Sequence, residues 1–432
     1  MTARALLVSA VASGQGKTTV TAGLARYFMR QGQRVAVFKA GADFLDALML
    51  ERACGHPVQV LDLWMVGEAE CRRLLDEAVR VTDVVLIEGV MGLYDGMPSS
   101  ADLARAFDLA VLAVIDVRAM AQTVGAVAAG LRDYGAIRLA GVIANGVASD
   151  GHRAMVSSAL RDIPLVATLP RQAASLPERH LGLSLPGENA AIDAQLEALG
   201  RALALDARVW EGLAADRTAE PGDLGSRALT RLLAGLRVAV ARDAAFAFLY
   251  PANIVCLERL GAAVSFFSPL AGEPVPADAA AVFLPGGYPE LHAQTLSQAV
   301  RFHQSIRAAH AAGVPILAEC GGMMALAESL GDTQGRQWAM AGLLAGSTHM
   351  QPRLAALGLQ AWRTKLGELR GHTFHYSVFD SPLIGAAQTI AHPRGTRGEI
   401  IYRVGTLTAS YFHAYFNSCP RAIAALLRGC DP

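Results

Sequence analysis

Residues 13–19 (SGQGKTT) have the types and spacing of a phosphate-binding loop, set between an apolar run and a helical segment. Glycines let backbone N–H groups approach phosphate oxygens, and the start of the following helix adds positive potential. Lys17 can reach the β- and γ-phosphates, and the Thr18 hydroxyl can hold Mg²⁺. Val11 stands where the strict motif has its first glycine, so this is a variant loop. We predict ATP and Mg²⁺ binding, with nucleotide ligands at Gly14, Gly16, Lys17, Thr18 and Thr19.

A second group that could do chemistry is the thiol of Cys320, in the segment VPILAECGGMM. A buried strand ends there and a helix begins after two glycines, which is the pattern of a nucleophile elbow. A helix start lowers the pKa of a thiol and leaves backbone N–H groups free to stabilise an oxyanion. A cysteine at a strand end can also be a small buried apolar residue, so the local pattern leaves both interpretations open.

Three carboxylates follow predicted strands of the first half. Asp43 and Asp46 come after the second strand, and Glu88 ends the third. Carboxylates at the carboxyl ends of parallel strands face the crevice where doubly wound sheets bind ligands. Each of them alone could be a turn or helix-cap residue. Together, beside a phosphate loop, they predict Mg²⁺ coordination with Thr18.

Strands that alternate with helices must position these groups. Apolar, β-branched runs at 5–11, 34–40, 83–89, 109–117 and 139–147 predict a parallel, doubly wound sheet. A second α/β series starts at residue 236 and reaches Cys320. Since single cores split beyond about 250 to 300 residues, we expect two domains. The expected division is an ATP-binding domain at 1–200, a linker at 201–232 and a second α/β domain at 233–432.

Composition narrows the class of partner. Lys plus Arg (38) equals Asp plus Glu (38), so no global positive field favours nucleic acid. The six cysteines lack the spacing of a disulfide framework, which indicates a reducing compartment. Residues 1–13 resemble a short signal peptide but run directly into the phosphate loop, and no apolar stretch reaches membrane-spanning length. We expect a cytoplasmic protein without nucleic-acid or membrane partners.

Several long motifs are similar to those of the cobyrinate and hydrogenobyrinate a,c-diamide synthases, and the resemblance runs nearly end to end. The motifs that carry it are SGQGKTTVT, GADFLD, LDLWM, IEGVMGLYDG, RHLGL (179–183), ARDAAFAFLYP, FFSPL, LPGGYPELH, AECGGMM, GHTFHYS and ASYFHAYF. The resemblance implies a fold: a dethiobiotin-synthetase-like P-loop domain followed by a flavodoxin-like class I glutamine amidotransferase domain.

The resemblance also implies roles in the second half. Cys320 is then the glutaminase nucleophile, His413 its base, and Gly286 and Gly287 part of the oxyanion hole. A Cys–His pair suffices for thioester chemistry. This branch lacks the acidic third member of the triad. The rival bases, which we interpret as polar structural residues, are His349, His372 and His375.

In the first half, the resemblance assigns Lys17 and Thr18 to ATP and Mg²⁺, and Asp43 and Glu88 to the metal. It places Asp46 on the substrate side of the site. Asn145 matches an adenine-contacting asparagine. The next residue is Gly146, where relatives usually have arginine. The segment 42–60 departs from the family pattern and faces the macrocycle, which leaves the identity of the tetrapyrrole open.

The implied reaction begins when ATP phosphorylates a substrate carboxylate. Ammonia, released from glutamine at Cys320, then displaces phosphate from the acyl phosphate. Two amidations are expected, on the a and c acetate side chains of a corrin macrocycle. Alternatives are a nickel-sirohydrochlorin a,c-diamide synthase, a cobyric acid synthase, or a ParA-like ATPase switch. The sequence does not decide the order of amidation or the oligomeric state, for which a homodimer is one possibility.

Overall fold

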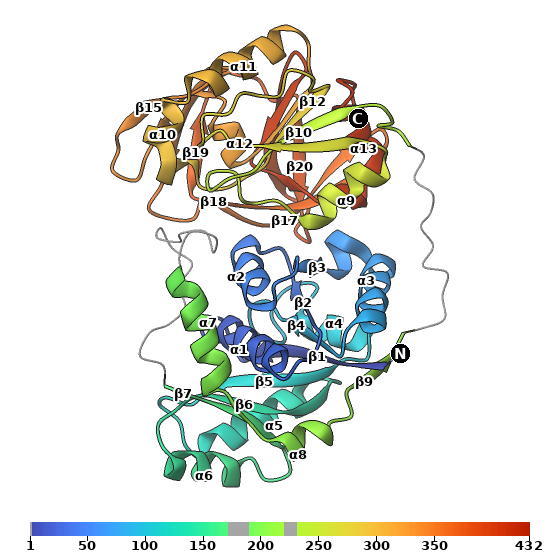
Figure 1. The fold of residues 1–432 in the computed structure, drawn as a ribbon, viewed down its shortest axis with the longest axis vertical. Coiled ribbons are helices and arrows are strands. Elements are labelled where there is room, and N and C mark those ends of the chain that lie inside the picture. Colours follow the sequence, from blue (N-terminus) through green and yellow to red (C-terminus); the bar gives the residue numbers. More distant parts are fainter. Residues whose placement is uncertain (1, 172–189, 220–230) are drawn as a thin grey trace. The chain divides into compact units, whose positions relative to one another are not determined.

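The computed structural model describes residues 2–171, 190–219 and 231–432, which divide into two compact units (Figure 1). Unit 1 is Met1–Leu224 and unit 2 is Gly225–Pro432. The RHLGL motif lies outside the described residues.

Unit 1 is built on a nine-stranded sheet of order β3-β2-β4-β1-β5-β6-β7-β8, with β9 paired to β1. Its strands are β1 (Thr2–Ala10), β2 (Val35–Ala40), β3 (Gln59–Leu61), β4 (Val84–Glu88), β5 (Ala110–Asp116), β6 (Arg138–Val147), β7 (Leu165–Pro170), β8 (Ala204–Leu205) and β9 (Asp216–Thr218). All neighbouring pairs from β3 to β7 are parallel, while β8 and β9 are antiparallel to their partners. The predicted parallel sheet is therefore confirmed, and the carboxyl ends of β1, β2 and β4 meet at one edge.

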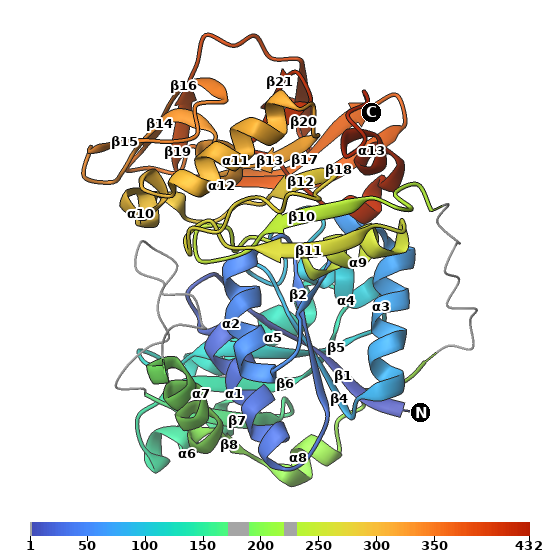
Figure 2. The ribbon, with the colours of Figure 1, turned by 45° about the horizontal axis from the view of Figure 1, so that its top comes forward.

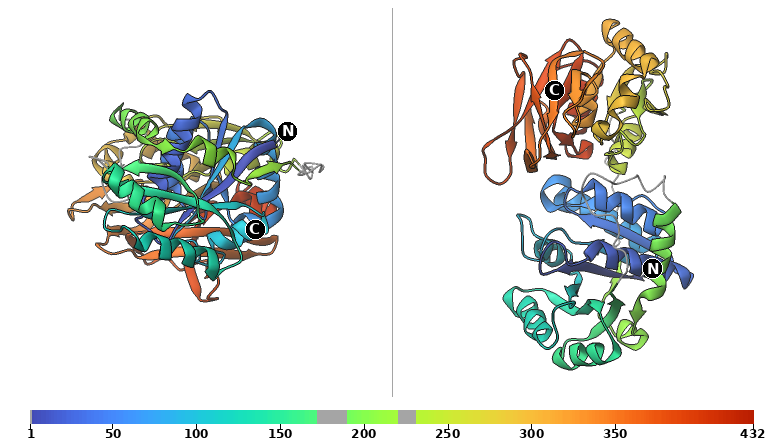
Figure 3. Two further views of the ribbon diagram at one scale, coloured as in Figure 1. Left: turned by 90° about the horizontal axis from the view of Figure 1, so that it is seen from below. Right: turned by 90° about the vertical axis from the view of Figure 1, so that its left-hand side faces the viewer.

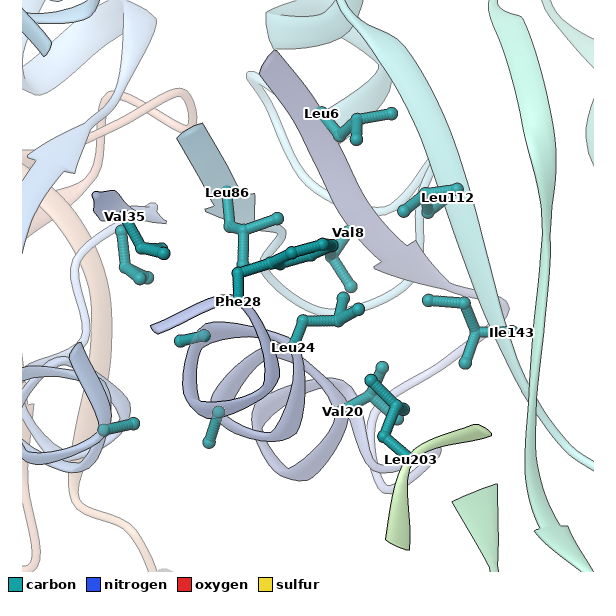
Figure 4. Close-up of a cluster of buried hydrophobic side chains, with 14 of the residues drawn as sticks. Leu6, Val8, Val20, Leu24, Phe28, Val35, Leu86, Leu112, Ile143 and Leu203 are labelled. Atoms are coloured by element: carbon teal, nitrogen blue, oxygen red, sulfur yellow. The ribbon is translucent and has the colours of Figure 1, made fainter. Parts of the chain in front are cut away.

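Helices cover both faces of this sheet (Figures 1 and 3). They are α1 (Lys17–Arg30), α2 (Phe44–Cys54), the π-helical turn η1 (Leu63–Gly67), α3 (Glu68–Val81), α4 (Ser100–Ala106), α5 (Thr123–Tyr134), α6 (Asp150–Ala159), α7 (Ala190–Ala202) and α8 (Ala207–Glu211). Val20, Leu24 and Phe28 lie four residues apart, so they form one stripe of α1. Figure 4 shows this stripe directed at Val8 and Leu86 of the sheet, in a core that also includes residues of α2 and α7. The first turn of α1 is thereby fixed against the end of β1.

Part of the segment expected as a linker at 201–232 belongs to unit 1. Residues 204–218 contribute β8, which pairs with β7, and β9, which pairs with β1. Trp210 of α8 is buried and its ring packs on Phe28. The division between the units falls at Leu224 and Gly225. The short two- and three-residue strands of this segment give too weak a periodicity to be recognised from sequence.

Unit 2 contains a ten-stranded sheet and a separate four-stranded sheet (Figure 2). The large sheet has the order β11-β10-β12-β13-β22-β21-β20-β17-β18-β23, and the small one β15-β14-β16-β19. The strands are β10 (Arg237–Ala241), β11 (Ala263–Phe267), β12 (Ala281–Leu284), β13 (Ile316–Glu319), β14 (Ala327–Gly331), β15 (Gln337–Ala339), β16 (Leu344–Met350), β17 (Ala356–Thr364), β18 (Gly367–His375), β19 (Ser377–Asp380), β20 (Ala387–Ala391), β21 (Arg397–Val404), β22 (Leu407–Ser410) and β23 (His413–Ala414).

The first five strands of the large sheet are parallel, and in chain order they lie as 2-1-3-4-5. This is the flavodoxin-like order that was expected. The helices of unit 2 are α9 (Pro251–Arg259), α10 (Ala293–Ser297), α11 (Val300–Ala311), α12 (Gly321–Met324) and α13 (Pro420–Leu426), with the 3₁₀ turns η2 (Pro289–His292) and η3 (Phe416–Ser418). Within the described parts of the chain, no helix has the length and apolarity needed to cross a membrane.

Candidate functional site

The phosphate loop joins β1 to α1 in unit 1. Gly14 and Gly16 have φ angles of +77° and +84°, a left-handed conformation that glycine adopts without strain. A side chain at Gly16 would also lie 2.3 Å from the amide nitrogen of Asn145. Both glycines are therefore required by the backbone path, and α1 begins directly at Lys17.

The Lys17 side chain is buried against the loop itself. Its Nζ donates to the carbonyl oxygens of Ala12 (3.2 Å) and Met91 (2.6 Å). Met91 belongs to the segment after β4, so the lysine ties that segment to the phosphate loop. The ammonium group is thereby held beside the phosphate loop.

Four side chains form a connected polar network at the carboxyl ends of β2 and β4. The Thr18 hydroxyl donates to Glu88 Oε1 at 2.8 Å. Lys39 Nζ lies 2.9 Å from the same Glu88 oxygen and 2.8 Å from Asp46 Oδ2. Lys39 and Glu88 are direct cross-strand neighbours and both side chains are fully buried. The structure therefore brings Thr18, Asp46 and Glu88 together around a cation that sequence reasoning missed.

The charge states of this network follow from burial and pairing. Burial lowers the pKa of Lys39, but the Asp46, Glu88 and Asp43 carboxylates outweigh it and leave the pKa above its ordinary value. Burial raises the pKa of Glu88 to about 7, with Asp46 adding to the rise and Lys39 opposing it. A lysine inside the apolar strand VAVFKA was the available signal, because a buried lysine requires a partner.

Two side chains of this network carry oxygens of the kind that bind magnesium ions. Glu88 Oε2 is buried and makes no hydrogen bond to the residues that the structure describes. The Thr18 hydroxyl donates to Oε1, the other oxygen of the same carboxylate. Hydroxyl and carboxylate oxygens are the donors that Mg²⁺ prefers. Asp43 also serves as the N-cap of α2, because its Oδ1 accepts hydrogen bonds from the N–H groups of Leu45 and Asp46.

Asn145 lies on β6 next to the phosphate loop. Its amide nitrogen donates to the Gln15 carbonyl at 3.0 Å, so it supports the loop. A side chain at Gly146 would lie 2.4 Å from Cγ of Arg118. Arg118 therefore occupies the space that a larger residue at position 146 would need. Thr19 lies in the first turn of α1.

Cys320 lies at the sharp turn between β13 and α12 in unit 2. Its φ of +45° and ψ of −107° are strained for a residue with a side chain, as in a nucleophile elbow. Its N–H donates to Ser410 O at 2.7 Å, which anchors the turn to β22. A side chain at Gly322 would lie 2.2 Å from Leu284 O, so only glycine permits the following turn.

His413 and Gly286 meet at this elbow. A side chain at Gly286 would lie 2.3 Å from His413 Cε1 and 3.3 Å from Cys320 Cβ. A side chain at Gly321 would lie 2.9 Å from the Gly287 nitrogen, so the Gly287 N–H group flanks the elbow. The structure thus brings together the four residues that the sequence proposed for glutaminase chemistry.

The three rival histidines have other surroundings. His372 stacks on His413, with ring centroids 4.9 Å apart, and its Nδ1 bonds to Tyr250. His375 lies between the Ser377 carbonyl and Glu399. His349 is on β16 of the small sheet. The stacked position makes His372 a packing partner of His413.

Burial sets the charge states of the Cys–His pair. It raises the pKa of the Cys320 thiol, the Glu290 and Glu319 carboxylates add to the rise, and the Gly321 N–H opposes it. The N–H at the helix start lowers this pKa, as expected, but burial outweighs it, so the expectation of a net lowered pKa is wrong. Burial also holds the pKa of His413 well below its usual range. Both shifts favour the neutral forms, a thiol and an imidazole.

Comparisons with known proteins agree with this architecture. Residues 6–183 match a family model described as a CobQ/CobB/MinD/ParA nucleotide binding domain. Residues 237–420 match a CobB/CobQ-like glutamine amidotransferase domain. A P-loop unit followed by a glutaminase unit defines a carbon–nitrogen ligase that uses glutamine as its nitrogen donor.

Full-length relatives narrow the class. The chain is 55% identical over 424 residues to the cobyrinate a,c-diamide synthase of Herminiimonas arsenicoxydans, covering 98% of this chain and 96% of the relative. It is 53% identical over 432 residues to the hydrogenobyrinate a,c-diamide synthase of Stutzerimonas stutzeri, covering 98% of each chain. The corresponding enzyme of Pseudomonas aeruginosa is 50% identical over 433 residues, covering 98% of this chain and 97% of the relative. The chain belongs to the cobyrinate/hydrogenobyrinate a,c-diamide synthase family, which confirms the resemblance drawn from the motifs.

Proposed function

We propose that this chain uses ATP and glutamine to amidate the a and c acetate carboxylates of cobyrinic or hydrogenobyrinic acid. One observation carries the proposal: a single chain holds both a phosphate loop with a buried charge network and a strained Cys–His elbow. Synthesis of an amide needs an activated carboxylate and a source of ammonia. Each unit supplies one of these requirements.

In unit 1, the γ-phosphoryl group of ATP is transferred to a substrate carboxylate oxygen, giving an acyl phosphate and ADP. Lys17 neutralises charge on the transferring group. Ammonia then attacks the acyl carbon, and phosphate leaves as the C–N bond forms. Phosphate is a far better leaving group than hydroxide, so phosphorylation of the carboxylate by ATP makes amide formation feasible.

The polar network serves this step by holding oxygens and cations in place. Mg²⁺, held by Thr18 and Glu88 with Asp43 nearby, would neutralise phosphate charge. Asp46 is assigned to the macrocycle side, and its ion pair with Lys39 fixes its carboxylate relative to Glu88. The adenine contact is assigned to Asn145, whose amide adjoins the loop. Gly14, Gly16 and Thr19 complete the phosphate contacts.

In unit 2, His413 takes the proton of the Cys320 thiol as sulfur attacks the carboxamide carbon of glutamine. The developing oxyanion is stabilised by backbone N–H groups at Gly286 and Gly287. Ammonia leaves with the proton held by His413, and water hydrolyses the glutamyl thioester to glutamate. The neutral forms that both pKa shifts favour support this order of events.

The expected setting remains part of the proposal: a cytoplasmic enzyme of small-molecule substrates, with a homodimer as one assembly to test. All six cysteines are free thiols, which fits a reducing compartment.

The test is an assay of cobyrinic and hydrogenobyrinic acids side by side, with ATP, Mg²⁺ and glutamine, followed by mass analysis of the amides. We expect the diamide of at least one acid, with one glutamine and one ATP consumed per amide. ATP turnover without amide formation from either acid would contradict the proposal.

A further inference from the structure

Glu319 is the last residue of β13 and directly precedes Cys320. Its side chain is 5% exposed, and that of His413 is 1% exposed. One carboxylate oxygen, Oε1, accepts the Ala414 N–H at 3.1 Å. The other, Oε2, lies 3.9 Å from His413 Nδ1. A buried carboxylate thus faces the ring nitrogen of the histidine beside the elbow.

The resemblance implied a Cys–His pair without an acidic third member. We propose that Glu319 supplies this function, as a positioning residue that orients His413 and stabilises its imidazolium form. The inference rests on the glutaminase roles proposed above for Cys320 and His413. Nδ1 is the ring nitrogen on the carboxylate side, 3.9 Å from Oε2, and the proposal assigns proton exchange with the thiol to Nε2.

The burial of Glu319 supports a partner of positive charge. Burial raises its pKa to about 8, and the single hydrogen bond from Ala414 opposes this only in part. A buried carboxylate is costly unless it is paired. In the ionised form of Glu319, the carboxylate and the imidazolium that forms when His413 accepts the thiol proton compensate each other. The neighbouring His372 stacks on the ring and carries no negative charge to do this.

Other ionisable groups near the elbow are oriented differently. Glu399 is held by the His375 ring and the Thr373 hydroxyl. Glu290 lies in η2 and adds to the raised pKa of the thiol. Of these carboxylates, Glu319 has the ion-pair geometry toward His413.

The Glu319→Gln variant separates an electrostatic role from a structural one. Glutamine keeps the side-chain length and an oxygen that can accept the Ala414 N–H, but it loses the charge. Because an opposite charge at this distance shifts a pKa by about 1 to 3 units, we expect glutamine-dependent kcat to fall about 10- to 1,000-fold. KM for glutamine should change by less than about threefold, since the loss affects proton transfer and not ground-state binding. Synthesis with free ammonia should be retained.

Glu328→Gln is the matched control. Glu328 is an exposed residue of the same unit that also accepts a backbone N–H, from Gly346 at 3.0 Å. Its substitution should leave both activities unchanged. In a His413→Ala background, Glu319→Gln should cause no additional loss, because the residue acts through the histidine.

Glutamine-dependent kcat of Glu319→Gln within about twofold of the parent protein would overturn the inference, as would additive losses in the double variant. If Glu319→Gln also loses ammonia-dependent synthesis, the variant is damaged beyond the glutaminase site, and Glu319→Asp is tested in its place. The shorter carboxylate should then give a partial loss confined to the glutamine reaction, and full activity would overturn the inference. Failure of the proposed function is distinguishable, because Cys320→Ser would then retain glutamine use.

Discussion

Replacing Lys39 by methionine tests the buried charge network of unit 1. The change keeps an unbranched chain of similar length and removes the ammonium group between Asp46 and Glu88. Both carboxylates are almost fully buried, with exposed fractions of 8% and 0%. Removing one partner from a buried ion pair costs about 3 to 5 kcal/mol, because the remaining charge is uncompensated. For a unit of this size, that corresponds to a fall in Tm of roughly 6 to 20 °C.

The loss should depend on pH in a defined direction. The pKa of Glu88 is raised to about 7 in the folded state, so the folded carboxyl prefers its proton. Its unfavourable contribution is absent below the ordinary pKa near 4.5 and develops as pH rises toward 7. Without Lys39, which lowers this pKa, the ionised form is more costly still. The Tm deficit of the variant should therefore be smaller at about pH 5 than at about pH 8.

Calorimetric unfolding at both pH values provides the measurement, with Arg34→Met as the matched control. Arg34 directly precedes β2 and pairs with Asp83, but the two side chains are 57% and 42% exposed. Such a surface pair contributes about 0 to 1 kcal/mol. An equal loss in the two variants, or a Lys39→Met deficit that does not change with pH, would refute the reasoning.

Three further outcomes are expected. Lys17→Ala should abolish amide formation with glutamine and with ammonia, because it removes the cation on the transferring phosphoryl group; product formation at the parent rate would place the ATP site elsewhere. Asp46→Asn should slow macrocycle use or the second amidation, so monoamide should accumulate in a timed assay, whereas unchanged product ratios would remove its substrate-side role. Gly286→Ala should lower glutamine-dependent kcat by at least about 100-fold and spare the ammonia reaction, because a methyl group would collide with His413, 2.3 Å away. If Gly286→Ala and the parent protein had equal kcat values with glutamine, the elbow would have to accommodate the methyl group without loss of function.

Local sequence was sufficient for the phosphate loop and the elbow. Both depend on glycines at tight turns and on the change from strand to helix, which neighbouring residues encode. The apolar runs likewise predicted the parallel strands of the two large sheets, since their periodicity reflects burial, but not the separate four-stranded sheet of unit 2.

The charge network could not be predicted in the same way, because it depends on register between strands. Lys39 stands directly opposite Glu88 across β2 and β4, which are 49 positions apart in the chain. Glu319 reaches His413 across 94 positions, from β13 to β23. The Cys320 pKa was misjudged for a related reason: the local helix start was visible in the sequence, but the depth of burial was not.

The division of labour between the two units is tested most directly by Cys320→Ser, assayed with glutamine and with ammonia as alternative nitrogen donors. The thiol is needed only for the glutamyl thioester, and serine is a much poorer nucleophile beside a base of low pKa. Glutamine-dependent diamide synthesis should fall by at least about 1,000-fold. Ammonia-dependent synthesis should persist and should rise with pH as ammonium loses its proton. Retained glutamine use would identify the wrong nucleophile, and loss of both activities in a folded protein would contradict the separation of glutaminase and synthetase chemistry.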